Sequence, residues 1–115
     1  RLFDMYLDPV EHAAFTGSSV TIAAEPGARF GAFNDVLTGT ILQVVPKRLI
    51  VQSWRSPQWA ATDIDSTLIL TFVAEGDGAR IELTQVNVVD PDFAGVSQGW
   101  EKYYWTPWRE YLARE

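Results

Sequence analysis

The sequence contains no cysteine and only one histidine, His12, among its 115 residues. The absence of cysteine excludes disulfides, thiolate metal sites and cysteine nucleophiles. A single histidine excludes a metal site built on two histidines. Serine nucleophiles are not indicated either, because Ser18, Ser19 and Ser66 lack the flanking glycines of a nucleophile elbow. The sequence therefore predicts no catalytic residue of these classes.

Positive charge is also scarce. Nine Lys and Arg residues stand against fifteen Asp and Glu residues, which gives a net charge of −6 with no basic cluster. A nucleic-acid backbone or an anionic membrane surface would be repelled by such a chain. No apolar run approaches the roughly 18 residues that a membrane-spanning helix needs. With no cysteine and no visible signal peptide, the sequence predicts a cytoplasmic protein that binds neither nucleic acid nor membrane.

The acidic pairs and glycines do not form a cofactor motif. Asp63 with Asp65 and Asp90 with Asp92 offer too few oxygen ligands for a calcium loop, and neither pair has the required glycine. We interpret them as loop and helix-cap residues. Gly27 and the glycine four residues later lack the third glycine and the following helix of a phosphate-binding loop. The sequence therefore predicts no metal and no cofactor.

Helix signals open the chain. Residues 1–7 have the apolar spacing of a helix, and Asp8 then begins a second one. Asp8 is a good N-cap, Pro9 suits the first helical position, and Glu11 completes a capping-box pattern. This second helix is expected to end at Thr16 and Gly17.

Strand signals follow, separated by turn residues and without intervening helices, which predicts an antiparallel meander. Gly39 is expected to mark a bulge or bend. Trp59 lies in a loop, at residues 56–63. The predicted strands are Ser19–Ala24, Arg29–Phe33, Val36–Val45, Leu49–Arg55, Asp65–Glu75 and Arg80–Val88.

The last 21 residues, Gly95–Glu115, read as one long helix with three of the five tryptophans of the chain. Its apolar residues, from Val96 to Leu112, cover an arc of roughly 200° at 100° per residue, whereas an ordinary surface helix buries about 100°. Pro107 predicts a kink or a loosened turn near Tyr103 and Tyr104. The expected fold is a single α+β domain over residues 1–115, a curved antiparallel sheet of about six strands that grips the C-terminal helix, with two short helices near the N-terminus.

These motifs resemble the C-terminal domain of activators of the ninety-kilodalton heat-shock chaperone ATPase, and their single-domain bacterial relatives, within the START-like or helix-grip superfamily. The resemblance covers nearly the whole chain. The matching motifs occur in the family order: Asp8-Pro9-x-Glu11-His12 with Phe15-Thr16-Gly17, Pro26-Gly27-Ala28-Arg29-Phe30, Val36-x3-Thr40, Val45-Pro46 with Leu49-Ile50-Val51 and Trp54-Arg55, Ser66-Thr67-Leu68 with Leu70-Thr71-Phe72, and Gly99-Trp100 with Tyr103-Tyr104-Trp105.

The resemblance implies a helix-grip fold and several functions. Family members include co-chaperone domains linked to stress response and binders of lipids or polyketides. They usually begin with a strand before the first helix, so the sheet here is expected to lack the family's first strand. Eukaryotic activators also carry a separate N-terminal chaperone-binding domain, for which these 115 residues have no room.

Aromatic residues dispersed along the sequence are expected to converge between the sheet and the C-terminal helix. They could fill the space as an ordinary core, or line a cavity for a small hydrophobic ligand. Trp59 is expected to serve as a lid or rim residue, because a loop tryptophan must pack back or contact a partner. The predicted cavity lining is Phe30, Phe33, Trp54, Trp59, Leu68, Leu70, Leu83, Trp100, Tyr104 and Trp108.

Three functions remain open at this point. The preferred prediction is a non-catalytic domain that binds a small apolar ligand, which requires a real void. The alternative is a protein-interaction domain that stimulates a chaperone ATPase, which requires an exposed apolar or charged patch. An enzyme, a cyclase or hydrolase by resemblance, would need at least two convergent titratable groups, with candidates Glu101, His12, Tyr103 and Tyr104. For His12 we expect a structural or surface role.

Overall fold

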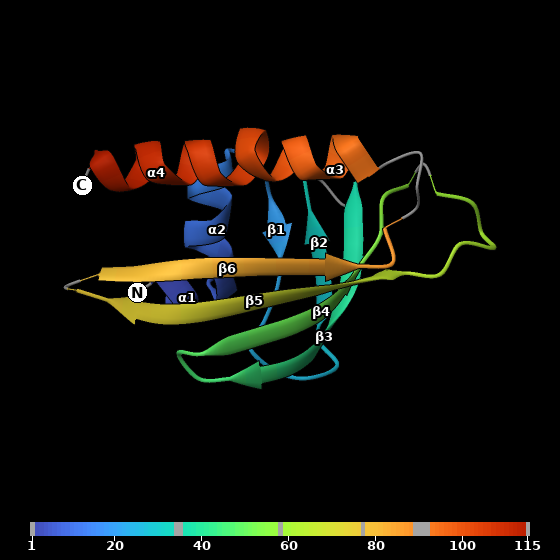
Figure 1. The fold of residues 1–115 in the computed structure, drawn as a ribbon, viewed down its shortest axis with the longest axis horizontal. Coiled ribbons are helices and arrows are strands. Elements are labelled where there is room, and N and C mark those ends of the chain that lie inside the picture. The colour runs from blue at the N-terminus through green and yellow to red at the C-terminus, as the bar shows by residue number, and fades with distance from the viewer. Residues whose placement is uncertain (1, 34–35, 58, 77, 89–92, 115) are drawn as a thin grey trace.

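In the computed structural model, the described residues are 2–33, 36–57, 59–76, 78–88 and 93–114. Two short helices, α1 (Leu2–Leu7) and α2 (Pro9–Thr16), precede a six-stranded sheet, and a long helix follows it (Figure 1). The six strands are antiparallel and lie in sequence order, as expected for a meander. The predicted α+β class and element order are therefore confirmed.

The strands are shorter than predicted at several ends, above all the first, which pairs over only two residues. Residues 34–35 and 77, which lie between predicted strands, and the pair Asp90 and Asp92 are outside the described residues. The strands are β1 (Val20–Thr21), β2 (Arg29–Ala32), β3 (Leu37–Val45), β4 (Leu49–Trp54), β5 (Ser66–Glu75) and β6 (Gly78–Val86).

The irregularity in β3 is not at Gly39, and the predicted bulge at that position is wrong. The pairing with β4 shifts between Ile41 and Gln43, while Gly39 pairs regularly with Phe30 of β2. Glycine is needed at position 39 for another reason: a Cβ atom there would lie 1.9 Å from the carbonyl oxygen of Ser53 on the neighbouring strand. The close approach of two backbones, rather than a bulge, explains this glycine.

The predicted boundaries of α2 are confirmed. The Asp8 carboxylate accepts hydrogen bonds from two N–H groups of the first turn, including that of Glu11 at 3.4 Å. Gly17 ends the helix in the left-handed conformation (φ 77°), and its N–H donates to Ala13. The reciprocal half of the capping box does not form, because the Asp8 N–H donates to the carbonyl of Asp4 in α1 instead.

The C-terminal helix is continuous but not uniform. Its middle is π-helical, and the Thr106 N–H donates to the carbonyl of Glu101, five residues earlier. The loosened turn predicted from Pro107 is thereby confirmed: proline has no N–H for the Tyr103 carbonyl and its ring would clash with it, which a wider turn relieves. The three parts are α3 (Phe93–Gly99), η2 (Trp100–Trp105) and α4 (Thr106–Ala113).

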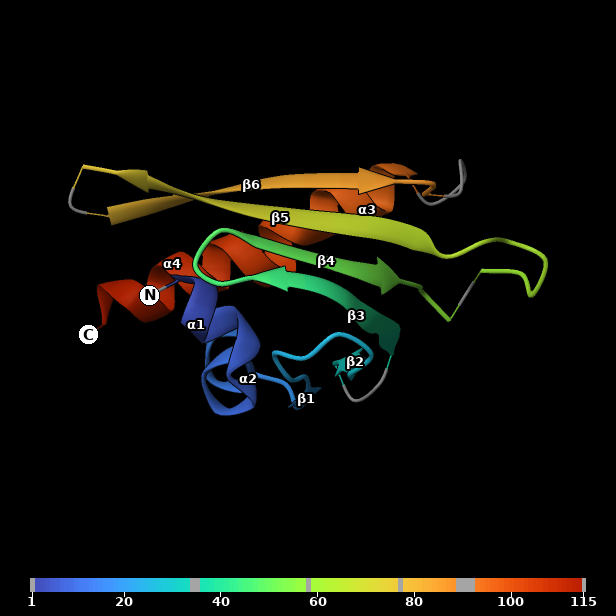
Figure 2. The same ribbon diagram turned by 90° about the horizontal axis from the view of Figure 1, so that it is seen from below.

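This helix lies across one face of the sheet, from behind β5 and β6 at its beginning to α2 at its end (Figure 2). Most of the predicted arc of about 200° packs against the core, and only its edge at Tyr103 is exposed, to 51%. The buried or partly buried residues of this arc include Val96, Trp100, Tyr104, Trp105, Trp108, Tyr111 and Leu112. The wide apolar arc is therefore confirmed apart from Tyr103, and the helix buries more than the single stripe of an ordinary surface helix.

The hydrophobic core fills the space between this sheet face and the helices. Alternate residues of β5 point inward, as predicted: Leu68, Leu70 and Phe72 are buried. Ile50 and Trp54 do the same on β4. Alternation with a period of two thus assigns one face of each central strand to the core. No helix among the described residues is both long and apolar enough to cross a membrane.

Candidate functional site

A cleft of about 500 Å³ lies between one end of the sheet and the first half of the C-terminal helix. Val36 and Tyr103, both about half exposed, stand at its mouth. Its walls are mostly apolar and aromatic. They are formed by Phe33, Val36, Leu37, Trp54, Ser56, Gly95, Val96, Gly99, Trp100, Tyr103 and Tyr104.

The helix wall combines small and large residues. Gly95 and Gly99 are four apart and so lie on the same helix face, where the missing side chains leave room. A Cβ atom at Gly99 would meet only the ring of Tyr103, at 3.7 Å. The π-helical turn then brings Trp100, Tyr103 and Tyr104 together at the cleft. π-Helical turns of this kind are frequent at functional sites.

On the sheet side, Phe33 follows β2 and holds an unusual backbone conformation. Its φ is 53°, in the left-handed region that bulky residues rarely occupy. Its ring meets Tyr103 and Tyr104 edge-on, with both centroid distances at 5.9 Å. Edge-to-face contacts at this distance are favourable. The conformation of Phe33 therefore closes one side of the cleft against the helix.

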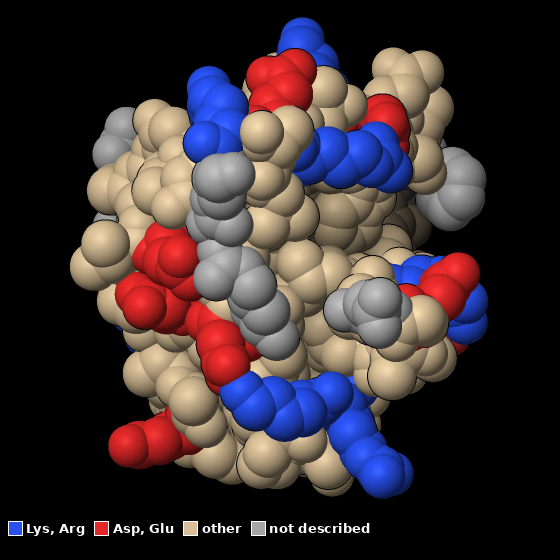
Figure 3. All heavy atoms as spheres, turned by 90° about the vertical axis from the view of Figure 1, so that its left-hand side faces the viewer, with Lys and Arg blue, Asp and Glu red and all other residues tan. Residues whose placement is uncertain are grey.

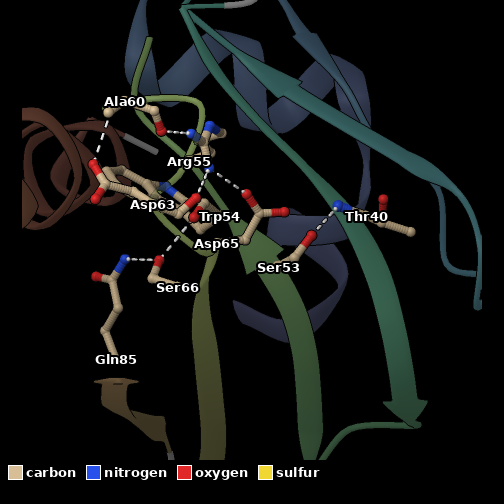
Figure 4. A network of polar contacts seen from close by, with 9 residues as sticks. All are labelled: Thr40, Ser53, Trp54, Arg55, Ala60, Asp63, Asp65, Ser66 and Gln85. Carbon is tan, nitrogen blue, oxygen red and sulfur yellow. Dashed lines mark hydrogen bonds and ion pairs between the residues drawn. The ribbon is translucent and has the colours of Figure 1, made fainter. Parts of the chain in front are cut away.

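A chain of hydrogen bonds fixes the two tryptophans of the cleft. The Trp100 indole N–H donates to Gln85 Oε1 on β6 (2.9 Å), and Gln85 Nε2 donates to Ser66 Oγ on β5 (3.0 Å). Ser66 Oγ donates in turn to the carbonyl of Trp54 on β4 (2.8 Å; Figure 4). The chain ties the helix to three strands and explains why Ser66 is buried.

The loop after β4 is fastened back onto the protein. Arg55 donates to the carbonyl of Asp63 (2.8 Å) and pairs with the Asp65 carboxylate (2.9 Å; Figure 4). Within this loop Trp59 is buried, and its ring meets that of Trp54 edge-on at 5.6 Å. Trp59 therefore supports Trp54 from behind and does not line the cleft, contrary to the predicted lid role. The interpretation of Asp63 and Asp65 as loop residues is confirmed.

His12 is buried beside the cleft and is fully engaged. Its Nδ1–H donates to the Tyr6 carbonyl (2.7 Å), so in the neutral ring Nε2 accepts from the Tyr104 hydroxyl (2.9 Å). Burial lowers the pKa of His12 to about 4 and raises the pKa of both Tyr6 and Tyr104. The Tyr6 hydroxyl donates to Gln52 Oε1 (2.6 Å). Of the structural and surface roles predicted for His12, its burial and its two hydrogen bonds support the structural one. Its bonds to Tyr6 and Tyr104 join α2 to α1 and η2, and the Tyr6 hydroxyl extends the connection to β4.

The four titratable candidates for catalysis do not meet in the cleft. Tyr103 and Tyr104 line it, whereas His12 does not. Glu101 forms an exposed ion pair with Arg109 (2.9 Å). Among the described residues, the cleft therefore holds no acid–base pair beyond two tyrosines. No group of three or more metal-ligating side chains occurs in the described part of the chain either.

Four of the ten residues predicted to line a cavity do so: Phe33, Trp54, Trp100 and Tyr104. Phe30, Leu68 and Leu70 are core residues, Leu83 is half-buried against the core, and Trp59 and Trp108 pack elsewhere. Sequence reasoning missed Val36, Leu37, Ser56, Gly95, Val96, Gly99 and Tyr103 as lining residues. The i, i+4 spacing of two glycines in an otherwise aromatic helix was the signal that could have found the helix wall.

The opposite end of the same helix is filled. Trp108 stacks on Phe15 of α2 with centroids 4.2 Å apart, and Phe15 stacks on His12 at 5.0 Å. We call this cluster of His12, Phe15 and Trp108 the packed end, and the region around the cleft the cleft end. The molecular face that carries the end of α4 and the β5–β6 turn shows acidic and basic side chains interspersed (Figure 3).

A curved antiparallel meander with a long C-terminal helix across one face defines a helix-grip domain of the START-like class. The chain belongs to the family described as "Activator of Hsp90 ATPase homolog 1-like protein", which it matches over residues 1–113. The family predicted from the sequence motifs is thus confirmed.

Individual relatives agree with this assignment. The chain is 28% identical over 91 residues to "Activator of 90 kDa heat shock protein ATPase homolog 1" of Homo sapiens, covering 79% of this chain and 27% of that protein. It is 26% identical over 101 residues to "Activator of 90 kDa heat shock protein ATPase homolog" of Dictyostelium discoideum, covering 87% and 26%. The chain thus spans about a quarter of the length of these relatives.

The fold has a close match among solved structures. The crystal structure of an HSP90 activator from Plasmodium falciparum superposes with a TM-score of 0.89, covering 97% of this chain and 86% of that chain. Sequence identity is 19%, so this likeness concerns the fold alone.

Proposed function

We propose that this chain is a non-catalytic domain that binds a small hydrophobic molecule in the cleft. One observation carries the proposal: a space of about 500 Å³ bounded mainly by aromatic and aliphatic side chains. Ligand sites commonly occupy about 300–1,000 Å³ and are mostly apolar with a few polar groups. A purely structural contact between helix and sheet would be filled to the density of a protein interior. A cytoplasmic location, predicted from the sequence, is part of this proposal.

Native mass spectrometry of the purified protein, compared with its denatured mass, tests the proposal directly. A reproducible additional mass is expected, and Val96→Trp should abolish it by filling the cleft from the helix wall. Gln98→Trp is the matched control, because Gln98 is exposed on the same helix and does not line the cleft. Retention of the ligand by Val96→Trp, or equal loss in both variants, would exclude the cleft as the site.

Stimulation of a chaperone ATPase is the second candidate. It is favoured by the family and by relatives named as activators of the 90 kDa heat-shock protein ATPase. In this chain, Val36 and Tyr103 are exposed apolar side chains at the mouth of the cleft, and a partner could cover them. The ATPase rate of a purified Hsp90-type chaperone should then rise on addition of this chain, and less so with Tyr103→Ser. An unchanged rate at saturating concentrations would remove this candidate.

A further inference from the structure

The cleft offers no charge to a ligand. Its walls, among the residues that the structure describes, consist of aromatic, aliphatic and glycine residues together with Ser56. A charged group that enters such a site loses its hydration without gaining an opposite charge. An anion would also meet the overall net charge of −6. The composition of the walls therefore favours an uncharged molecule.

Three ring-borne hydrogen-bond donors stand in the buried part of these walls, and two of them are already engaged. The Tyr104 hydroxyl donates to His12 (2.9 Å), and the Trp100 indole N–H donates to Gln85 (2.9 Å). The third, Nε1–H of Trp54, is buried and has no hydrogen-bond partner among the residues that the structure describes. A buried N–H without an acceptor is unfavourable, and most such groups in proteins have one.

We infer that the cleft takes a neutral apolar molecule with a hydrogen-bond acceptor, such as a ketone or ester oxygen, and that Trp54 Nε1–H donates to it. This inference rests on the proposed ligand-binding function. The Trp54 side chain forms part of the wall and is 5% exposed. Because its nitrogen is buried, the indole must turn for the N–H to reach a ligand acceptor in the cleft.

The chain contains a matched control for this donor. Trp108 Nε1 is also buried without a partner in the described part of the chain, but Trp108 stacks on Phe15 at the packed end and does not line the cleft. Trp54→Phe and Trp108→Phe thus remove the same chemical group from a similarly buried site. Only the first is expected to change the recognition of a ligand acceptor.

Three probe molecules of nearly equal size separate the contributions of the hydrogen-bond acceptor, the apolar ring system and the charge to binding. Methyl naphthyl ketone carries the acceptor, isopropylnaphthalene replaces it with a hydrocarbon group, and naphthoate replaces it with an anion. Affinities for the full chain and both variants are measured by calorimetric titration, after circular dichroism has shown that the variants are folded. The decisive quantity is the ratio of the ketone affinity to the hydrocarbon affinity.

We expect Trp54→Phe to lower this ratio about 3- to 10-fold, the usual worth of one hydrogen bond, and Trp108→Phe to leave it unchanged. Naphthoate should bind the unmodified chain at least tenfold more weakly than the ketone. An unchanged ratio in Trp54→Phe, or equal binding of naphthoate and ketone, overturns the inference while ligand binding itself stands. Failure of all three probes to bind the unmodified chain would overturn both the inference and the proposed function.

Discussion

The two ends of the C-terminal helix rest on the same sheet but are packed differently. At the packed end, α2 fills the space beside the helix, and the rings of Phe15 and Trp108 stack at 4.2 Å. At the cleft end no helix of the described residues takes that place, and two glycines, Gly95 and Gly99, help to leave a space of about 500 Å³. The aromatic stripe continues through both ends. A hydrophobic sequence pattern therefore indicates which face of the helix turns toward the sheet, while the neighbouring elements determine whether the space beside that face is filled by side chains.

This difference predicts that substitutions at the packed end mainly affect stability, whereas substitutions at the cleft end mainly affect binding. The largest expected effect is that of Trp108→Ala. Removing a fully packed tryptophan side chain should lower the free energy of unfolding by about 3–5 kcal/mol, measured by urea denaturation. Trp100→Ala, beside the existing cleft, should cost clearly less. Equal losses in the two variants would contradict the comparison.

The protonation of His12, at the packed end, predicts how the stability of the protein depends on pH. Its pKa is lowered by burial from 6.5 to about 4 in the folded protein, so the folded state prefers the neutral ring. The contribution of His12 to the free energy of unfolding should be fully present above pH 6.5. It should decrease between pH 6.5 and 4, because the unfolded chain takes up a proton there, and should not decrease further below pH 4. The loss attributable to this residue is about 3 kcal/mol.

Urea denaturation at several pH values measures this effect as a difference between the parent chain and His12→Gln. The contributions of carboxylates that titrate in both proteins largely cancel in that difference. Tyr6 and Tyr104, the neighbours of His12, stay protonated because burial raises the pKa of each. Parallel pH profiles for the two proteins would show that His12 is not the source of the pH dependence.

A smaller loss of stability is expected when the hydrogen bonds of Gln85, which connect the helix and the sheet at the cleft end, are removed. Gln85→Leu leaves the Trp100 N–H without its acceptor and Ser66 without its donor, and should lower the free energy of unfolding by about 1–3 kcal/mol. It should also weaken any ligand of the cleft, because Trp100 is no longer fixed. Thr84→Val, at the exposed neighbouring position on β6, serves as the control. Unaltered stability in Gln85→Leu would mean that water replaces the glutamine fully.

The smallest effect on stability should come from Tyr103→Ser. Tyr103 is half exposed, so its loss should change the free energy of unfolding by no more than about 0.5 kcal/mol. Binding in the cleft should nevertheless weaken several-fold, because the ring stands at the mouth. Thermal unfolding and calorimetric titration of the same sample measure both quantities. A large loss of stability would place Tyr103 among the core residues instead.

The sequence was most informative where the cause of structure is local. Asp8, Pro9 and Gly17 identified the limits of α2, and the alternation of Leu68 and Leu70 identified the buried face of β5. Pro107 predicted the loosened turn in the long helix, because proline affects its own helix wherever that helix lies. The fold class could be predicted from such local signals taken in order.

The site was less predictable because it depends on contacts between distant segments. The bond between His12 and Tyr104 joins residues 92 positions apart, and neither residue has a local pattern that indicates the other. The position of the cleft depends on where packing leaves space, so Leu70, Leu83 and Trp108 could be recognised as inward-facing but not assigned to core or cleft. The reason for a glycine at position 39 could not be predicted either, because it depends on the backbone of Ser53 on another strand.

The π-helical turn has one more consequence, for changes in chain length. A π-turn holds one residue more than an α-turn while the helix on either side keeps its direction and facing, so it is equivalent to an insertion that the helix has absorbed. Deleting the exposed Lys102 should therefore convert η2 to an ordinary α-helix and leave Trp108 on Phe15, at the cost of the proline clash that the wider turn relieves. Elsewhere in the helix, a one-residue deletion would turn every following side chain away from its partner. The segment that lines the cleft is thus also the place where this helix can gain or lose a residue without losing the fold.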